Sequence, residues 1–237
     1  NCPHLSITGG PHFRLRGDVS LQDLSRPQDA FVFGNLSNLY ADPEGVAFFV
    51  RNLSKNYESV PPILQRLGTI SFHGEVSGYF TDIVTYGLIY TDIGSIKTDL
   101  KISSDKEKGY FAYSGAVKTE ELELGNMLDN EKLGKVTFNL DIEGSHYENQ
   151  YPSIVMKGLI ASIDYSDYNY ENITLDGEYK QGGFNGKIAL DDPNGSIYLN
   201  GDVNVASKVP TFNFLAVVNK VRPHDLNLTT KYPDAEF

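Results

Sequence analysis

The chain has 237 residues, and its 20 lysine and arginine residues against 31 aspartate and glutamate residues give a formal net charge of -11. Lysines are scattered, and this balance argues against a nucleic-acid-binding protein, because phosphate contacts dominate that affinity. The single cysteine, Cys2, excludes a disulfide framework within the chain. The 15 tyrosine, 13 phenylalanine and 22 glycine residues favour strands joined by turns.

The N-terminal region combines weak strand signals with the strongest helix signal. Residues 12–18 and 30–33 could form strands at the end of a preceding β segment, which would occupy residues 1–41. Asp42 suits a helix cap and Pro43 a first helical position. The apolar residues that follow recur at helical spacing: Val46, Phe49, Val50 and Leu53. A second short helix is predicted at 62–67, ended by Gly68. Residues 42–67 are therefore interpreted as a short helical connection or cap.

From residue 68 to residue 237 the apolar pattern has a period of two, as in half-buried antiparallel strands. The alternation predicts strands at 69–78, 96–102, 111–117, 135–144, 173–179, 184–190 and 197–205. The run 67–72 also recurs in kind at 133–138, 66 residues later. Such an echo indicates a β array that extends rather than closes.

Glycines fall in phase with the apolar face of these predicted strands. They are Gly74, Gly115, Gly158, Gly177, Gly186 and Gly201. A glycine inside a strand marks a bend or a close backbone approach, and a row of them lets a sheet curl. The fold class predicted is therefore mainly β, a long curled antiparallel sheet forming a U-shaped, taco-like groove. A closed β-sandwich with corner glycines explains the same pattern.

Several weak motifs, taken in order, resemble the TamB branch of the AsmA-like envelope proteins, in the form found in Bacteroides-type bacteria. They are residues 113–117, 122–128, 133–138, 159–165 and 168–177, followed by the 191–194 turn and Gly201. The resemblance covers roughly residues 30–237 and is best at 108–221. Leu122 and Asn126 depart from the phenylalanine and lysine of the family pattern.

The resemblance implies a periplasmic part of an inner-membrane-anchored protein of a Gram-negative bacterium. Such proteins cross the periplasm as a curled sheet and carry phospholipid acyl chains in its trough. The translocation and assembly module also works with an outer-membrane barrel of the TamA type in outer-membrane protein assembly. The expected partners are thus phospholipid and, through the full-length protein, that barrel. The chain, which opens at Asn1 and ends at Phe237, is interpreted as an excised piece whose membrane anchor lies outside it.

The expected lipid-binding residues are the apolar residues of the alternating strands. They are Ile70, Phe72, Val76, Ile96, Leu100, Phe111, Tyr113, Val136, Phe138, Leu140, Ile173, Leu175, Ile188, Leu190, Ile197, Leu199 and Val203. In a closed sandwich the same side chains would be ordinary core.

No catalytic, metal-binding or cofactor motif stands out. None of the five histidines has the i, i+4 partner of a helical zinc site, and no nucleophile elbow or phosphate-binding loop occurs. Asp191, Asp192 and Asn194 could supply oxygen ligands for calcium, but a Pro-Asn-Gly turn explains them equally well. The chain is therefore expected not to be an enzyme. The alternative function is a β-sandwich binding module of a surface adhesin or glycan-binding lipoprotein, with the tyrosines of 165–170 as a sugar platform.

Overall fold

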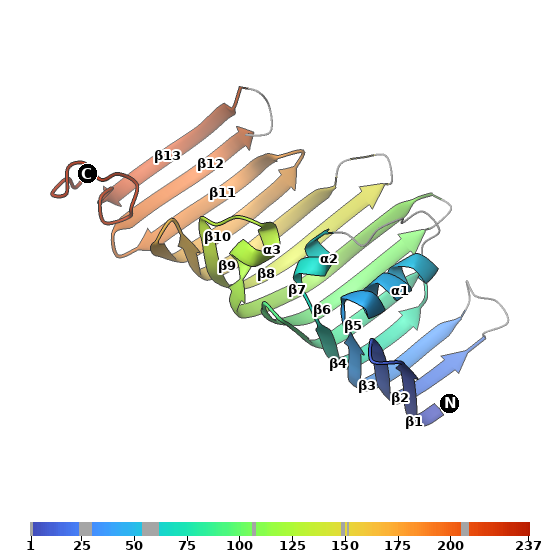
Figure 1. Cartoon of the computed structure of the whole chain (residues 1–237). Helices are drawn as coiled ribbons and strands as arrows, with labels where there is room; N and C mark the ends of the chain where they lie inside the picture. The colour runs from blue at the N-terminus through green and yellow to red at the C-terminus, as the bar shows by residue number, and fades with distance from the viewer. Residues whose placement is uncertain are drawn as a thin grey trace.

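The protein folds as one sheet of thirteen antiparallel strands. The computed structural model describes residues 2–23, 30–53, 62–105, 108–147, 150, 152–204 and 209–237. Within them, each strand pairs with its neighbours in the chain, so the spatial order runs from β1 to β13 without a crossover. Figure 1 shows β1 and β13 at opposite ends of an open, curled sheet.

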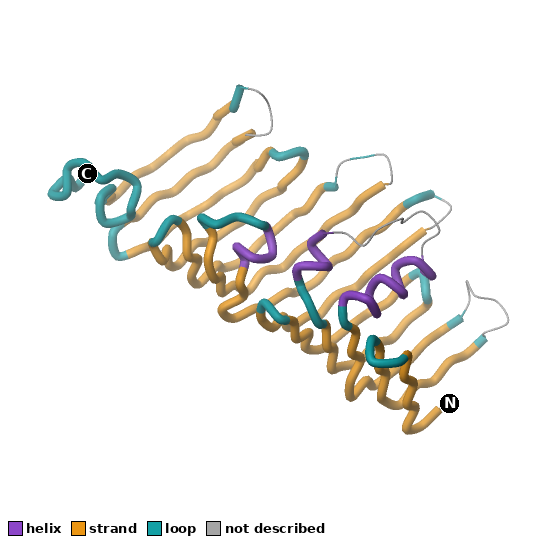
Figure 2. The backbone as a smooth tube through the Cα atoms, in the orientation of Figure 1, coloured by secondary structure: helices purple, strands orange, loops and turns teal. Residues whose placement is uncertain are grey.

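The elements alternate strand and turn, with three short helices inserted. The strands are β1 (Cys2–Gly9), β2 (Phe13–Gln22), β3 (Phe31–Ala41), β4 (Ile70–Tyr79), β5 (Asp82–Thr91), β6 (Gly94–Asp105), β7 (Tyr110–Glu123), β8 (Leu133–Tyr147), β9 (Ser153–Tyr165), β10 (Tyr168–Lys180), β11 (Gly183–Asp192), β12 (Gly195–Asn204) and β13 (Thr211–Val221). The helices are α1 (Pro43–Leu53), α2 (Pro62–Arg66) and α3 (Leu124–Leu128). All three helices lie on the same side of the sheet (Figure 2).

The sheet does not close, so the predicted fold class is confirmed. The described residues form a single sheet, and the closed-sandwich alternative is therefore wrong. The accessible surface supports this description. It measures 15115 Å², whereas a compact chain of 26.3 kDa exposes about 10,600 Å². One face of the sheet is left without a second layer over most of its length.

Four strands, β1, β5, β9 and β13, were not predicted from alternation. In β5, Val84, Tyr86, Leu88 and Tyr90 lie on the outer face and are as apolar as the inner-facing residues. In β13, Leu215 and Val217 similarly give the outer face an apolar character. A strand with two apolar faces loses the period-two hydropathy signal even though its geometry is unchanged.

The helix boundaries follow the predicted caps. The Asp42 carboxylate accepts a 2.9 Å hydrogen bond from the Gly45 backbone N–H, which satisfies one free donor at the start of α1. Gly68, at φ +68°, follows α2 in the left-handed region. Helix α3 was not predicted; Asp129 ends it in the left-handed conformation. The side chains of Phe49, Val50, Leu53 and Ile63 lie outside the described residues.

The two copies of the sequence echo begin equivalent strands, β4 and β8. At both starts a glycine packs against an aspartate of a neighbouring segment: Gly68 against Asp92 of the β5–β6 turn, and Gly134 against Asp164 near the end of β9. Asp92 accepts a 3.1 Å bond from the Thr69 N–H, and Asp164 accepts a 3.2 Å bond from the Lys135 N–H. The repeated sequence therefore makes the same kind of contact at the starts of two strands, on the rim of the sheet.

The inner-face glycines form two adjacent rows across the sheet. In one row Gly74 pairs with Gly87, and in the other Gly177 pairs with Gly186, which pairs with Gly201. At Gly115, in the second row, an added Cβ would overlap the Asp99 carbonyl oxygen, and φ is +136°. Neighbouring backbones therefore approach closely along these rows, where the sheet curls.

Replacing Gly115 with alanine is expected to lower the free energy of unfolding by about 2–4 kcal/mol, because the new Cβ meets backbone at a φ that L-residues rarely adopt. Gly34 is a matched control in the same row. A Cβ there would meet Leu36 Cδ2 at 3.4 Å, an ordinary contact, so Gly34→Ala should be neutral or stabilise by up to about 1 kcal/mol. Urea unfolding measures both. Equal effects would contradict a backbone role for Gly115.

Candidate functional site

The candidate site is the inner face of the sheet, defined here as the face that carries Phe72, Leu140 and Leu199. Directly paired residues of antiparallel strands point to the same side, so the register assigns each side chain to a face. All seventeen predicted groove residues lie on this inner face. They are brought onto one surface rather than into one pocket.

One row illustrates how the strands build this surface. It runs from Phe72 through Ile89, Ile96, Thr119, Phe138, Ile160, Ile173, Leu190 and Ile197 to Val218. Ten strands, β4 to β13, therefore contribute to a single row in which every residue except Thr119 is apolar.

The prediction missed about as many inner-face residues as it named. They include Leu15, Leu36, Leu39, Ile83, Ile89, Ile102, Val117, Ile142, Ile154, Met156, Ile160, Ile163, Phe184, Phe212, Phe214 and Val218. Strand parity could have found those in the predicted strands. For β5, β9 and β13, where both faces are apolar, hydropathy gave no indication of which residues point inward.

The inner face is almost free of charge. Among the described inner-facing residues of β2 to β13, Asp192 is the one lysine, arginine, aspartate or glutamate, and it lies at the end of β11. The outer face instead carries ion pairs between neighbouring strands. Lys101 Nζ lies 3.0 Å from Asp82 Oδ1, and Lys157 Nζ lies 3.2 Å from Asp176 Oδ2. The two faces therefore differ in charge, although β5, β9 and β13 also carry apolar side chains on the outer face.

Asp192 is buried, and its carboxylate is occupied by contacts within the chain. It accepts hydrogen bonds from Tyr168 Oη at 2.6 Å, from the Asn194 N–H at 2.8 Å and from the Glu171 N–H at 3.1 Å. Burial, and then the bond to Asp192, raise the pKa of Tyr168 to about 12. This arrangement ties the β9–β10 and β11–β12 turns together and accounts for Asp192 without a metal ion.

Aromatic rings fill the space that the glycines leave. The ring of Phe72 lies over Gly74 and Gly87, that of Phe184 over Gly177, and that of Tyr113 over Gly144. Burial raises the pKa of the Tyr113 hydroxyl. At these positions an aromatic side chain occupies the space beside a glycine of a neighbouring strand.

The lining is covered in the middle of the sheet and open towards its C-terminal end. Leu122 and Val136 are 1% and 2% exposed, packed with Leu67 near α2 and with Leu124 and Met127 of α3. By contrast, Phe212 and Val218 of β13 are 62% and 51% exposed. Only ten apolar residues of the described chain are buried. The inner face is a half-exposed groove rather than a core.

The C-terminal segment covers part of the same rim. Leu226 is fully buried against Gly195, and its carbonyl accepts a 2.7 Å bond from Tyr170 Oη. Tyr170 therefore serves this rim contact and Tyr168 is bonded to Asp192, whereas Tyr165, the third tyrosine of residues 165–170, is 40% exposed.

The residues considered for chemistry do not converge. Within the described part of the chain, no group of three or more histidine, cysteine, aspartate or glutamate side chains is arranged so that it could hold a metal ion. No described helix is long and apolar enough to cross a membrane.

No protein-family model, curated protein or solved structure matches the chain.

His12 connects the β1–β2 turn to the start of α1. Its Nδ1 lies 2.7 Å from Asp42 Oδ2 and its Nε2 lies 3.1 Å from Glu44 Oε2. The hydrogen bond to Asp42, and then the charges of Asp42 and Glu44, raise the pKa of His12. The Asp42 pKa is lowered, chiefly by the Gly45 N–H and then by His12.

A raised histidine pKa stabilises the fold fully below the unfolded value of about 6.5, and the stabilisation is lost as pH rises through the folded pKa. His12→Gln should therefore lower the melting temperature more at about pH 5.5 than at about pH 8.5. His73→Gln is the control, since His73 contacts Ser71 and Tyr90 on the outer face. A pH-independent effect at His12 would contradict the ion-pair role.

Proposed function

We propose that the inner face is a lipid groove that holds phospholipid acyl chains as part of a periplasm-spanning envelope protein. One observation carries the proposal: an apolar, almost uncharged surface runs across the strands from β2 to β13 and is not closed by a second layer. An ordinary core with the same composition would be covered. The function needs continuous lining and open access, and no catalytic residue.

The dimensions suit extended hydrocarbon chains. Thirteen strands spaced about 4.8 Å apart give a groove roughly 58 Å long. The hydrocarbon core of a bilayer is about 30 Å thick, so one leaflet contributes roughly 15 Å of chain. Several acyl chains therefore fit along the groove. Each CH₂ group moved from water onto the lining contributes about 0.8 kcal/mol.

The resemblance to the TamB branch extends the proposal beyond simple binding. It favours lipid movement between the inner and outer membranes, and assistance to outer-membrane protein assembly with a TamA-type barrel. The acidic balance of the chain, at a net charge of -11, is consistent with lipid held by its tails rather than by electrostatic attraction to anionic heads.

The test places a charge on one face or the other of the same strand. Leu199 lies half-buried on the inner face of β12, and its neighbour Asn200 is exposed on the outer face. Wild-type protein purified without added detergent should carry phospholipid in native mass spectrometry. Leu199→Glu should carry at least about tenfold less phospholipid than the wild type, because an ionised carboxylate in the groove must be desolvated when lipid binds. Asn200→Glu should retain it.

Circular dichroism and thermal melting verify that both variants fold. Phe138→Glu, paired with Asn139→Glu on β8, repeats the comparison beneath the covered part of the groove. Wild-type protein that binds no lipid in this assay, even after incubation with phospholipid vesicles, would refute the groove function. Equal loss from the inner-face and outer-face variants would do so as well.

A further inference from the structure

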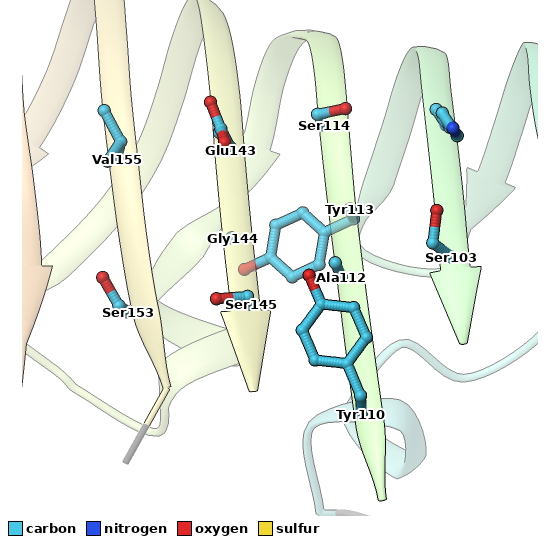
Figure 3. Close-up of a pocket in the computed structure, with 11 residues that line it drawn as sticks. Ser103, Tyr110, Ala112, Tyr113, Ser114, Glu143, Gly144, Ser145, Ser153 and Val155 are labelled. Atoms are coloured by element: carbon cyan, nitrogen blue, oxygen red, sulfur yellow. The ribbon is translucent and has the colours of Figure 1, made fainter. Parts of the chain in front are cut away.

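A second surface, on the opposite face of the sheet, has the form of a binding site. Strands β6 to β9 enclose a hollow of about 260 Å³ there (Figure 3). Its floor follows a row of four short side chains paired in register: Ser103, Ala112, Ser145 and Ser153. We call this row and its walls the outer trench. It exists because small residues coincide on four neighbouring strands, whereas the rows beside it carry larger ones.

The two walls of the outer trench differ in chemistry. On one side stands Tyr110, whose ring packs 4.9 Å from that of Tyr147, between centroids. On the other side lie Lys101, Glu143 and Val155. Figure 3 shows Tyr110 and Glu143 on opposite sides of the serine row. The trench thus offers an aromatic surface opposite a polar one.

The two serines at the ends of the row use their hydroxyl protons within the chain, so they face the trench as hydrogen-bond acceptors. Ser103 Oγ donates to Asp82 Oδ1 at 2.6 Å, and Ser153 Oγ donates to Glu178 Oε1. Each hydroxyl proton is thereby committed, while its lone pairs remain able to accept. The Glu143 carboxylate adds further acceptors. A suitable ligand must therefore bring its own donors.

The same contacts disfavour an anionic ligand. Lys101 Nζ, the cation of the trench, lies 3.0 Å from Asp82 and is neutralised by it. Glu143 and the nearby Glu178 would repel a phosphate or carboxylate. Hydroxyl donors on an uncharged ligand match the site better. An aromatic wall beside acceptor groups suits a ring with an apolar face and several hydroxyls.

We propose that the outer trench binds one ring of a neutral saccharide, with the apolar face of the ring against Tyr110 and hydroxyls donating to Ser103, Ser153 and Glu143. The volume of about 260 Å³ is below the 300–1,000 Å³ typical of drug-sized pockets, which suits a single ring. Because the trench is shallow and polar, a Kd of about 1 mM is expected. The inference does not depend on the lipid groove, since the two surfaces lie on opposite faces.

Saturation-transfer NMR with maltotriose, cellotriose and the trimer of N-acetylglucosamine, each at about 10 mM, tests the proposal. Wild-type protein should give a transfer signal with at least one of them. Ala112→Leu fills the trench without removing a hydrogen bond, and Tyr110→Ala removes the wall; both should weaken binding at least about tenfold. Tyr86→Ala, at an exposed tyrosine on the outer face of β5, is the matched control and should leave binding unchanged.

Two outcomes would overturn the proposal. One is the absence of any saccharide signal from folded wild-type protein. The other is a signal that survives in folded Ala112→Leu or Tyr110→Ala, which would place the sugar elsewhere. The groove variant Leu199→Glu should bind saccharide like the wild type. The lipid and saccharide measurements therefore test the groove proposal and the trench proposal separately.

Discussion

The architecture depends on backbones that approach closely at the inner-face glycines. At Gly115, Gly158 and Gly201 an added side chain would meet the backbone of a neighbouring strand, and φ lies in the left-handed range. These positions allow the long strands to bend across the sheet without breaking the ladder of hydrogen bonds. The pairing register has no shift between β10 and β11 or between β11 and β12. A groove forms because the sheet bends and the strands continue.

The bend brings large inner side chains close together without enclosing them. Val19, Leu36 and Phe72 form one buried cluster, and Leu122 with Val136 forms another. Both clusters are local, and large side chains farther along remain half-exposed. Local clusters are sufficient here because each strand from β2 to β12 is hydrogen-bonded to two neighbours, so no second sheet is needed to satisfy its backbone groups.

The rim on the helix side is held by aspartates rather than by apolar packing alone. Asp42, Asp92, Asp164 and Asp192 each accept a backbone N–H from the segment that follows or adjoins a turn. Aspartate suits this position because its short carboxylate reaches backbone donors that a turn leaves free. At the same rim, Leu67, which follows α2, and Leu124 and Met127 of α3 cover the lining.

Much of the fold could be predicted from the sequence, because alternation and in-phase glycines are direct consequences of sheet geometry. The curl and the face of all seventeen groove residues follow from those two signals, and the α1 cap at Asp42 follows from the Asp-Pro pair that begins a helical apolar pattern. Strands β5 and β13 could not be predicted, since apolar residues on their outer faces erase the alternation. The outer trench could not be predicted either. It requires Ser103, Ala112, Ser145 and Ser153 to stand in register, and the register between neighbouring strands is not a local property of the sequence.

An open apolar lining is unfavourable in water, and this free-energy cost favours a groove that holds an apolar ligand. The accessible surface of 15115 Å² exceeds that of a compact chain of the same mass by roughly 4,500 Å². Apolar area left in water forgoes about 25 cal/mol per Å² of stabilisation. A sheet that needed the lining only for stability would gain by closing on itself, and the glycine rows already provide the necessary bend. An occupant that covers the lining recovers this free energy without closing the sheet, so the open form is favoured most where apolar ligand is present.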